Sequence, residues 1–237
     1  MSINVIEYED FAVKTRHLTA IPPSLHTYFA WFAFGVMILL FVALITVNIN
    51  PSWLVTVMVA SALTLVFIYW RIRSQPAISM TLTYMHLQLH HPSGGWSVRW
   101  QDIQHVEQVS IEHDGWFEPI PWVGIKLRSY DHLMHSISPR LVSRILTDQR
   151  VLLIMSYRRG NRGSVDVEDM LFDDTPFTDH HGNTYTGLLA TFANRLKYNN
   201  ELLHSELLIP EEMLGLECDE FVGLARRYLA ASRQEPD

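Results

Sequence analysis

Charge is absent from a long stretch near the start of this 237-residue sequence. No Lys, Arg, Asp or Glu lies between Leu18 and Trp70. A helix of a soluble domain needs a polar face toward water, so this absence argues against an ordinary soluble fold there. Two apolar runs, 28–47 and 52–70, each have close to the roughly twenty residues with which a helix crosses a bilayer. The sequence therefore predicts a two-helix transmembrane hairpin over residues 28–71.

The ends of the predicted hairpin indicate its orientation. The link between the spans, 48–51, is short and ends in a proline that cannot continue the first helix, so the spans run antiparallel. Arg71 and Arg73 follow the second span, Lys14 and Arg16 precede the first, and the link has no charge. The positive-inside rule then places both termini in the cytoplasm. Neither span contains a charge that would suggest an ion pathway, which favours an anchor over a transporter.

Two further scarcities, of cysteine and of basic residues, limit the possible functions. Cys218 is the single cysteine, which excludes an internal disulfide and agrees with a reducing compartment. Its neighbours Glu217 and Asp219 disfavour a thiolate, so we interpret Cys218 as a structural thiol. Residues 74–237 hold fourteen Lys and Arg against twenty-two Asp and Glu. Nucleic-acid binding needs basic residues to neutralise phosphates, so this acidic balance argues against it.

Residues 76–237 predict a domain of the α+β class. Apolar and polar residues alternate, as in half-buried strands, over 78–84, 87–90, 96–100, 103–111 and 122–127. Ser138 followed by Pro139 is typical of a helix start, and helical spacing continues to Gly160, although 151–154 also suits a strand. We then predict an acidic loop, a helix, a short strand and a last helix, at 161–183, 187–199, 205–209 and from Asp219 onward.

Short sequence steps indicate a family resemblance. The Trp-Gln-Asp-Ile step at 100–103 and the Ile-Pro-Glu step at 209–211, behind two N-terminal spans, resemble bacterial membrane proteins with pleckstrin-homology-like domains. More narrowly, the chain resembles an uncharacterised two-span inner-membrane family of Gram-negative bacteria. The resemblance implies a partly open antiparallel β-barrel or sheet with a C-terminal helix and a helical insert. It also implies a multi-pass protein of the bacterial inner membrane, with a cytoplasmic N-terminal segment (1–27), the hairpin (28–71) and a cytosolic domain (76–237).

Histidine is enriched, with twelve residues in the chain. Three groups could supply metal ligands: His90 with His91, His132 with His135, and the Asp-His-His run at 179–181. A metal site needs three or four converging ligands, and no group has a third ligand at a recognisable spacing. We therefore predict no metal and no cofactor, and interpret the histidines as surface and hairpin residues. The chain also lacks a nucleophile elbow. We predict that it is not an enzyme, and a metal-dependent enzyme ranks below the other functions.

The segment at 158–164, Arg-Arg-Gly-Asn-Arg-Gly-Ser, is the best candidate for anion binding. Glycines let backbone amides approach an anion, and Arg158, Arg159 and Arg162 supply charge and forked donors. The simpler interpretation, which we favour, is a helix C-terminus whose arginines face its negative end. If the segment binds a ligand, we expect an anionic headgroup of a nearby membrane.

Large apolar residues are concentrated in a loop predicted at 114–124. They are Trp116, Phe117, Ile120 and Trp122. Aromatic side chains mostly bury their area, so one interpretation is that they cover an end of the sheet. The other is an exposed hydrophobic site for a partner or for the bilayer surface.

Taken together, an anchor without transport chemistry and a domain without a catalytic motif favour a membrane-tethered protein-interaction module. The expected partners are membrane lipids and a protein, with no nucleic acid. The alternative is a domain that senses anionic lipids or headgroups through Arg158, Arg159 and Arg162.

Overall fold

The computed structural model describes residues 15–19, 78–113, 116–159 and 166–233 and the single positions 34, 35, 38, 59, 61 and 63. The chain divides into two units, residues 1–20 with 78–237 and residues 21–77. No helix among the described residues is long and apolar enough to cross a membrane. The predicted spans lie almost wholly outside those residues, although the six single positions are helical. The transmembrane hairpin therefore stays a prediction.

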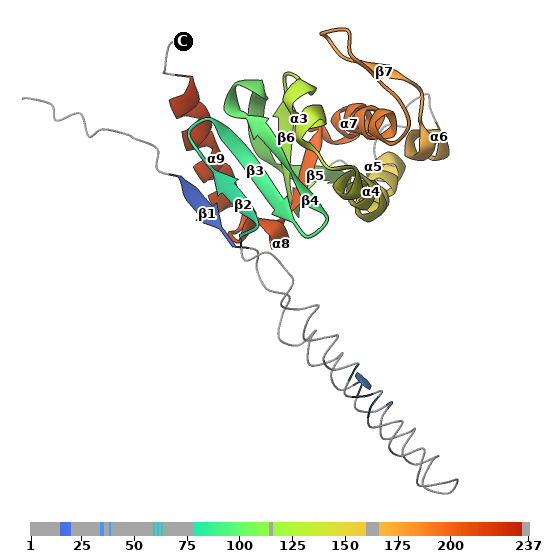
Figure 1. The fold of residues 1–237 in the computed structure, drawn as a ribbon, viewed down its shortest axis with the longest axis horizontal. Coiled ribbons are helices and arrows are strands. Elements are labelled where there is room, and N and C mark those ends of the chain that lie inside the picture. The colour runs from blue at the N-terminus through green and yellow to red at the C-terminus, as the bar shows by residue number, and fades with distance from the viewer. Residues whose placement is uncertain are drawn as a thin grey trace, which may run out of the picture. The chain divides into compact units, whose positions relative to one another are not determined.

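The first sheet has four antiparallel strands in the order β1-β2-β3-β4 (Figure 1). They are β1 (Arg16–Leu18), β2 (Met80–Leu82), β3 (His86–His91) and β4 (Gly94–Arg99). Leu18, Met80, Leu89 and Trp96 oppose one another from strand to strand and are all buried. Because side chains alternate between the two faces of a strand, this row gives the sheet its apolar face.

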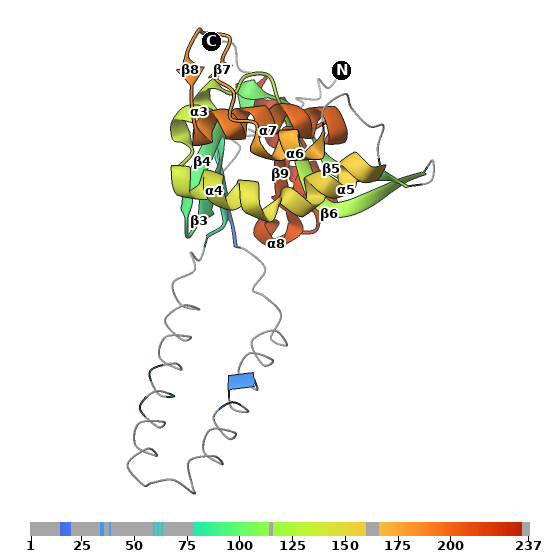
Figure 2. The same ribbon diagram turned by 90° about the vertical axis from the view of Figure 1, so that its right-hand side faces the viewer.

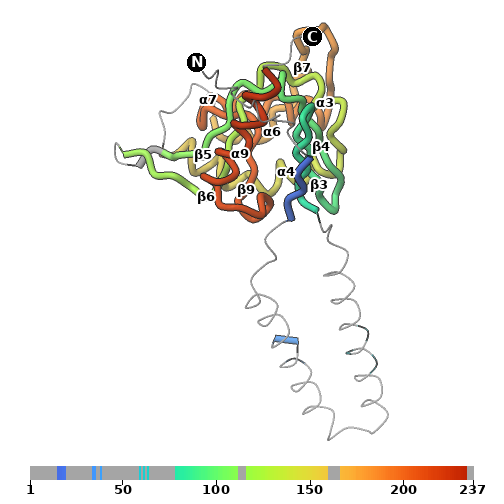
Figure 3. The backbone as a smooth tube through the Cα atoms, turned by 90° about the vertical axis from the view of Figure 1, so that its left-hand side faces the viewer, coloured from blue at the N-terminus to red at the C-terminus, as the bar shows by residue number. Residues whose placement is uncertain are grey.

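The second sheet is built on a long β-hairpin. β5 (Ile103–His113) pairs with β6 (Trp116–Leu127), and β9 (Leu207–Pro210) pairs with the other edge of β6. A short 3-10 helix, η1 (Trp100–Asp102), lies between β4 and β5. Figures 2 and 3, from opposite sides, show the outer part of the β5–β6 hairpin extending beyond the helices. We call this hairpin the arm.

The C-terminal helix α9 (Cys218–Ser232) packs against η1, β5 and β6. Trp100 in η1 is buried and stacks on Tyr228 of α9, with ring centroids 5.5 Å apart. Its Nε1 donates to the Thr83 carbonyl oxygen at 2.7 Å. One side chain thus joins α9 to the turn between β2 and β3. The main core is shared by both sheets and α9.

Most other helices lie between β6 and β9 in the chain, and Figure 1 shows α4, α5 and α7 on the side of the second sheet opposite α9. These elements are α3 (Asp131–Ser136), α4 (Pro139–Asp148), α5 (Arg150–Arg159), α6 (Val167–Phe172), β7 (Phe177–Thr178), β8 (Thr184–Tyr185) and α7 (Leu188–Leu203). A last short helix, α8 (Glu211–Leu214), follows β9. The predicted cap before α4 is confirmed, because Ser138 Oγ accepts from the Leu141 amide at 3.3 Å.

The structure confirms an α+β domain with antiparallel sheets and helices, and of the two predicted forms, a partly open barrel or a sheet, the described strands form sheets that do not close. Two predicted loops contain regular structure. Within 161–183, residues 167–172 form α6 and 177–178 form β7, and within 114–124, residues 116–121 are the outer half of β6. The histidine pair at 132 and 135 lies in α3. The outer half of β6 forms a strand although its apolar and polar residues do not alternate, because its backbone pairs with β5. Met170 and Leu171 of α6 bury against Leu153 of α5, a contact that local sequence does not reveal.

β1 changes the predicted division of the chain. The sequence analysis placed residues 1–27 in a segment of their own, whereas Arg16–Leu18 is an edge strand of the first sheet. The amide and Oγ of Ser79 both donate to the Leu18 carbonyl, at 2.9 and 3.2 Å. A methyl group at Gly215, which has φ 69°, would overlap the Thr19 carbonyl oxygen. The chain therefore leaves the domain after β1, where Thr19 packs closely against Gly215, and it returns beside this point at β2.

Candidate interaction surfaces

The arm has a buried base and an exposed tip. At the base, Val106 of β5 faces Ile125 of β6 inside the main core. Farther out, Val109 and Ile111 belong to a second apolar cluster, which includes residues of α5, α7 and β9. The register shifts between 108 and 110, and such a bulge increases the local twist of a hairpin. The helical layer thus supports the arm along β5 as far as Ile111.

The four apolar residues predicted as an interaction site do not form one exposed surface. Ile120 and Trp122 are half-buried and pack against the second cluster, so they support the arm. Trp116 and Phe117 lie beyond it, where their residues are 80% and 70% exposed. The predicted site is therefore reduced to two adjacent aromatic residues at the arm tip.

The sequence around the arm tip is acidic. Glu118 is exposed next to Phe117, Glu112 and Asp114 flank the turn in sequence, and no Lys or Arg occurs from residue 103 to 125. Apolar groups that enter an anionic membrane surface are usually accompanied by basic residues. This tip therefore suits an apolar protein pocket with a basic rim better than it suits a bilayer.

A second surface, the outer side of α4 and α5, is basic. Arg158 and Arg159 lie exposed in the last turn of α5, whereas Arg162 falls outside the described residues. The sequence analysis missed three further exposed arginines on these helices. They are Arg140, Arg144 and Arg150. The available signal was the near absence of acidic residues between 139 and 159.

Arg195 of α7 is a buried cation that the sequence analysis also missed. The residue is only 2% exposed, and its Nη2 donates to the Leu171 carbonyl oxygen at 3.2 Å. Its Nε and Nη1 have no hydrogen-bond partner in the part of the chain that the structure describes. Burial, with a smaller contribution from the Arg150 charge, lowers the pKa of Arg195 to about 10. This guanidinium is thus charged at neutral pH at a cost in stability.

A small apolar cavity lies between α4, α7 and β9, and its volume is about 70 Å³. Ile145, Phe192 and Trp122 contribute to its walls. Small-molecule pockets usually enclose about 300–1,000 Å³, so this cavity suits packing better than ligand binding. Glu206 borders it, accepting from the Leu127 amide at 2.8 Å, and burial raises the pKa of its carboxyl group.

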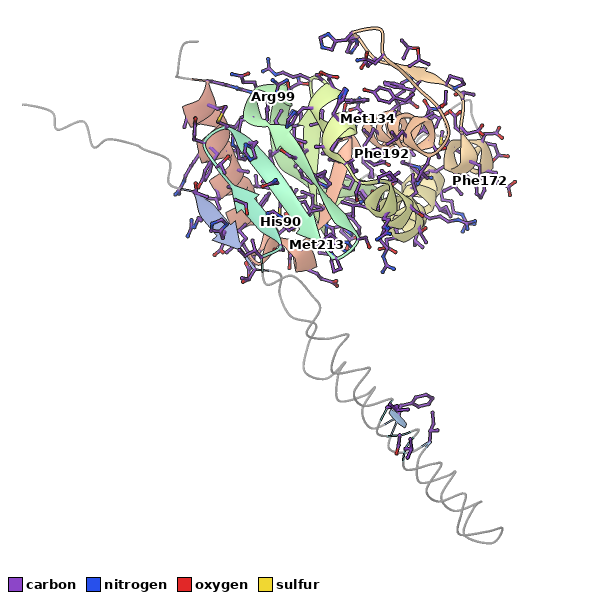
Figure 4. The ribbon with its side chains drawn as sticks, in the orientation of Figure 1. His90, Arg99, Met134, Phe172, Phe192 and Met213 are labelled. Atoms are coloured by element: carbon purple, nitrogen blue, oxygen red, sulfur yellow. The ribbon has the colours of Figure 1, made fainter. Side chains whose placement is uncertain are left out.

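The histidine groups make local hydrogen bonds. His90 Nε2 lies 3.0 Å from Thr81 Oγ1, and His132 Nε2 lies 3.3 Å from Ser97 Oγ. Figure 4 labels His90 on β3, in the first sheet. Among the described residues, no three or more His, Cys, Asp or Glu side chains are placed to hold a metal ion. The histidine pairs named in the sequence analysis are therefore not brought together with a third ligand there.

Cys218, at the start of α9, is buried. Burial is the largest cause of a raised pKa of its thiol, about 12, and the Glu211 carboxylate adds to it. A thiol of this kind is unreactive at neutral pH, as the structural interpretation of Cys218 predicted.

These features define the class: an α+β domain with an aromatic arm tip and a basic helical face. Comparison with protein families then shows to which family the chain belongs. The chain belongs to the family described as protein of unknown function (DUF2982), whose model matches residues 80–231. The match runs from the first residue of β2 into α9, so it covers the domain and not residues 21–77. No curated protein and no solved structure matches the chain significantly.

Proposed function

We propose that this protein is a membrane-tethered interaction module that presents the arm tip to a protein partner. The observation that carries the proposal is the exposure of Trp116 and Phe117 on paired strands that project from the domain. Because strand pairing holds the backbone, little ordering is needed when the rings bind. Burying each ring in a partner pocket contributes about 3 kcal/mol before ordering costs.

The tether would be a two-span hairpin formed by residues 28–71, in a bacterial inner membrane with both termini cytoplasmic. The paired ends of β1 and β2 support an even number of crossings, because Leu18 and Met80 are neighbours in one sheet. The helical residues Phe34, Ile38, Val59 and Leu63 each expose about half of their area, which suits contact with lipid.

The domain would be a variant of the pleckstrin-homology-like fold. Support comes from two antiparallel sheets followed by a C-terminal helix, α9, which packs on η1, β5 and β6. The variant adds β1 from before the hairpin and inserts α3 to α7 between β6 and β9. The exposed aromatic pair at the arm tip supports a binding function for this domain.

The proposal is tested by crosslinking in native membranes. A photoreactive residue replaces Glu118 in the full-length chain, next to the arm tip, and the crosslinked proteins are compared with those of a Trp116→Ala/Phe117→Ala variant. We expect one reproducible crosslinked protein that the double variant loses, because hot-spot aromatics contribute about 2 kcal/mol or more.

A matched control uses another exposed apolar pair. Tyr84 and Met85 lie in the turn between β2 and β3, and both are exposed. Tyr84→Ala/Met85→Ala should leave the crosslinked protein unchanged. Equal loss in both double variants, or the absence of any crosslinked protein that depends on the tip, would refute the arm as the binding element.

A further inference from the structure

The charges of the domain are unevenly distributed. Residues 139–159, which form α4 and α5, contain five arginines and a single acidic residue, Asp148. The rest of 74–237 contains nine basic and twenty-one acidic residues. Within the described part of 74–237, α4 and α5 are therefore the basic region of a domain whose remaining sequence is acidic.

The five arginines and two apolar residues share the solvent side of α4 and α5. The arginines are Arg140, Arg144, Arg150, Arg158 and Arg159, all exposed. Val151 and Met155, one turn apart on α5, are 64% and 39% exposed. Among the described residues, only Arg144 of the five forms an ion pair, with Asp148. We call this surface the basic face.

Helix electrostatics accounts for two of these arginines but not for two others. Arg158 and Arg159 face the negative end of α5, where cations are stabilised. Arg140 and Arg150, in contrast, lie in the first turns of α4 and α5, where the helix dipole disfavours a cation. Neither first turn contains an acidic residue. Arg150 also lies over the ring of Phe172, with its Cζ 5.9 Å from the ring centroid. An anionic partner outside the helices would offset the unfavourable dipole at Arg140 and Arg150.

We propose that the basic face docks on an anionic phospholipid surface, with Val151 and Met155 entering the boundary between headgroups and acyl chains. α4 and α5 have ten residues each, and twenty helical residues span about 30 Å. The arginines are therefore too dispersed to bind one small anion. Exposed apolar side chains among arginines are typical of interfacial helices. Figure 2 shows α4 and α5 in the lower half of the domain, where the end of β1 (blue) also lies, and Figure 1 shows β1 and these helices at opposite sides of the domain's width. The acidic remainder of the domain is repelled by such a surface, which leaves one docking orientation.

This inference rests on the proposed function in one respect, because the hairpin must hold the domain near the bilayer. The test uses the full-length chain in lipid nanodiscs of phosphatidylcholine, with or without about one-third phosphatidylglycerol. A Val151→Cys variant carries an environment-sensitive fluorophore, and nitroxide-labelled lipids quench it on contact. Labelling is selective, because the other cysteine, Cys218, is buried. An Ala230→Cys variant, labelled at an exposed position near the C-terminal end of α9, reports non-specific contact.

We expect quenching at position 151 in the anionic discs only, and none at position 230. Arg140→Gln/Arg150→Gln should lower the ratio of docked to undocked domain about thirtyfold, at about 1 kcal/mol for each arginine near an anionic surface. Arg128→Gln/Arg227→Gln removes the same charge from exposed positions elsewhere and should preserve docking. Raising the salt from 0.1 to 0.5 M should weaken docking, because salt screens exposed charges.

Three results would overturn the inference: equal quenching in neutral and anionic discs, equal loss in the two double variants, or protection of position 151 only when an acidic protein is added. The discs also separate the two proposals. A chain that does not enter a disc refutes the tether, whereas a chain that enters but keeps position 151 in water refutes only docking by the basic face.

Discussion

Replacing Arg195 with Met should make this protein more stable. The side chain is 2% exposed, and only its Nη2 has a hydrogen-bond partner among the described residues, the Leu171 carbonyl oxygen. Met keeps an unbranched apolar stem of similar length and removes the buried charge. Substitution of buried ionic groups by apolar residues of similar volume often stabilises proteins for this reason.

The magnitude follows from two opposing contributions. Burial is the main cause that lowers the pKa of Arg195 to about 10, and a change of this size corresponds to about 3 kcal/mol at 1.36 kcal/mol per pKa unit. Loss of the hydrogen bond to Leu171 costs about 1–2 kcal/mol. We therefore expect a net gain of about 1–2 kcal/mol. Because the folded-state pKa is lowered, this gain is full at pH 7 to 9 and shrinks as the pH rises through about 10.

The assay is urea unfolding of the full-length chain in mild detergent, followed by tryptophan fluorescence. At a slope of about 2 kcal/mol per molar urea, the midpoint should rise by about 0.5–1 M. The control is Arg227→Met, which removes an exposed arginine from α9 and should change stability by no more than about 0.5 kcal/mol. A loss of more than about 1 kcal/mol in Arg195→Met would show that this guanidinium is fully paired, and the reasoning would be wrong.

Three further substitutions test the fold. Trp100→Ala should lower the free energy of unfolding by about 3–5 kcal/mol, because it empties a buried site that stacks on Tyr228; a loss below about 1 kcal/mol in thermal melts would contradict this packing. Gly215→Ala should destabilise by more than about 1 kcal/mol and increase hydrogen exchange in β1, because a methyl group there overlaps Thr19; unchanged exchange would show that this contact is absent. Glu206→Gln should gain stability relative to the natural protein as the pH rises above about 4.5, because burial raises the folded-state pKa of the Glu206 carboxyl group; a pH-independent difference between the two proteins would refute the raised pKa.

Much of the domain follows from patterns that span only a few residues. Alternation of apolar residues predicted β2 to β5 and the inner half of β6, and the Ser-Pro pair at 138–139 predicted the start of α4. These signals are local, because a strand face repeats every two residues and a helix cap involves one turn. The α+β class could therefore be predicted from the sequence. The excess of acidic over basic residues in 74–237, after the charge-free stretch, could also be read from it.

The elements that local patterns missed are stabilised by distant contacts. β1 has three residues and gains its place by pairing with β2, more than sixty residues later. α6 depends on burial of Met170 and Leu171 against α5. Neither partner is visible within a short window of sequence, because loop lengths and packing decide which segments meet.

The candidate surfaces show the same division between sequence and tertiary structure. Composition alone indicated apolar residues near 114–124 and arginines near 158–162. Only the fold separated the exposed Trp116 and Phe117 from the supporting Ile120 and Trp122, because exposure depends on where the arm leaves the helical layer. The sequence by itself determined the charge-free stretch and the acidic domain, since both depend on residue identity. Tertiary structure decided that the chain leaves and re-enters the domain side by side, and that α4 and α5 present one basic face.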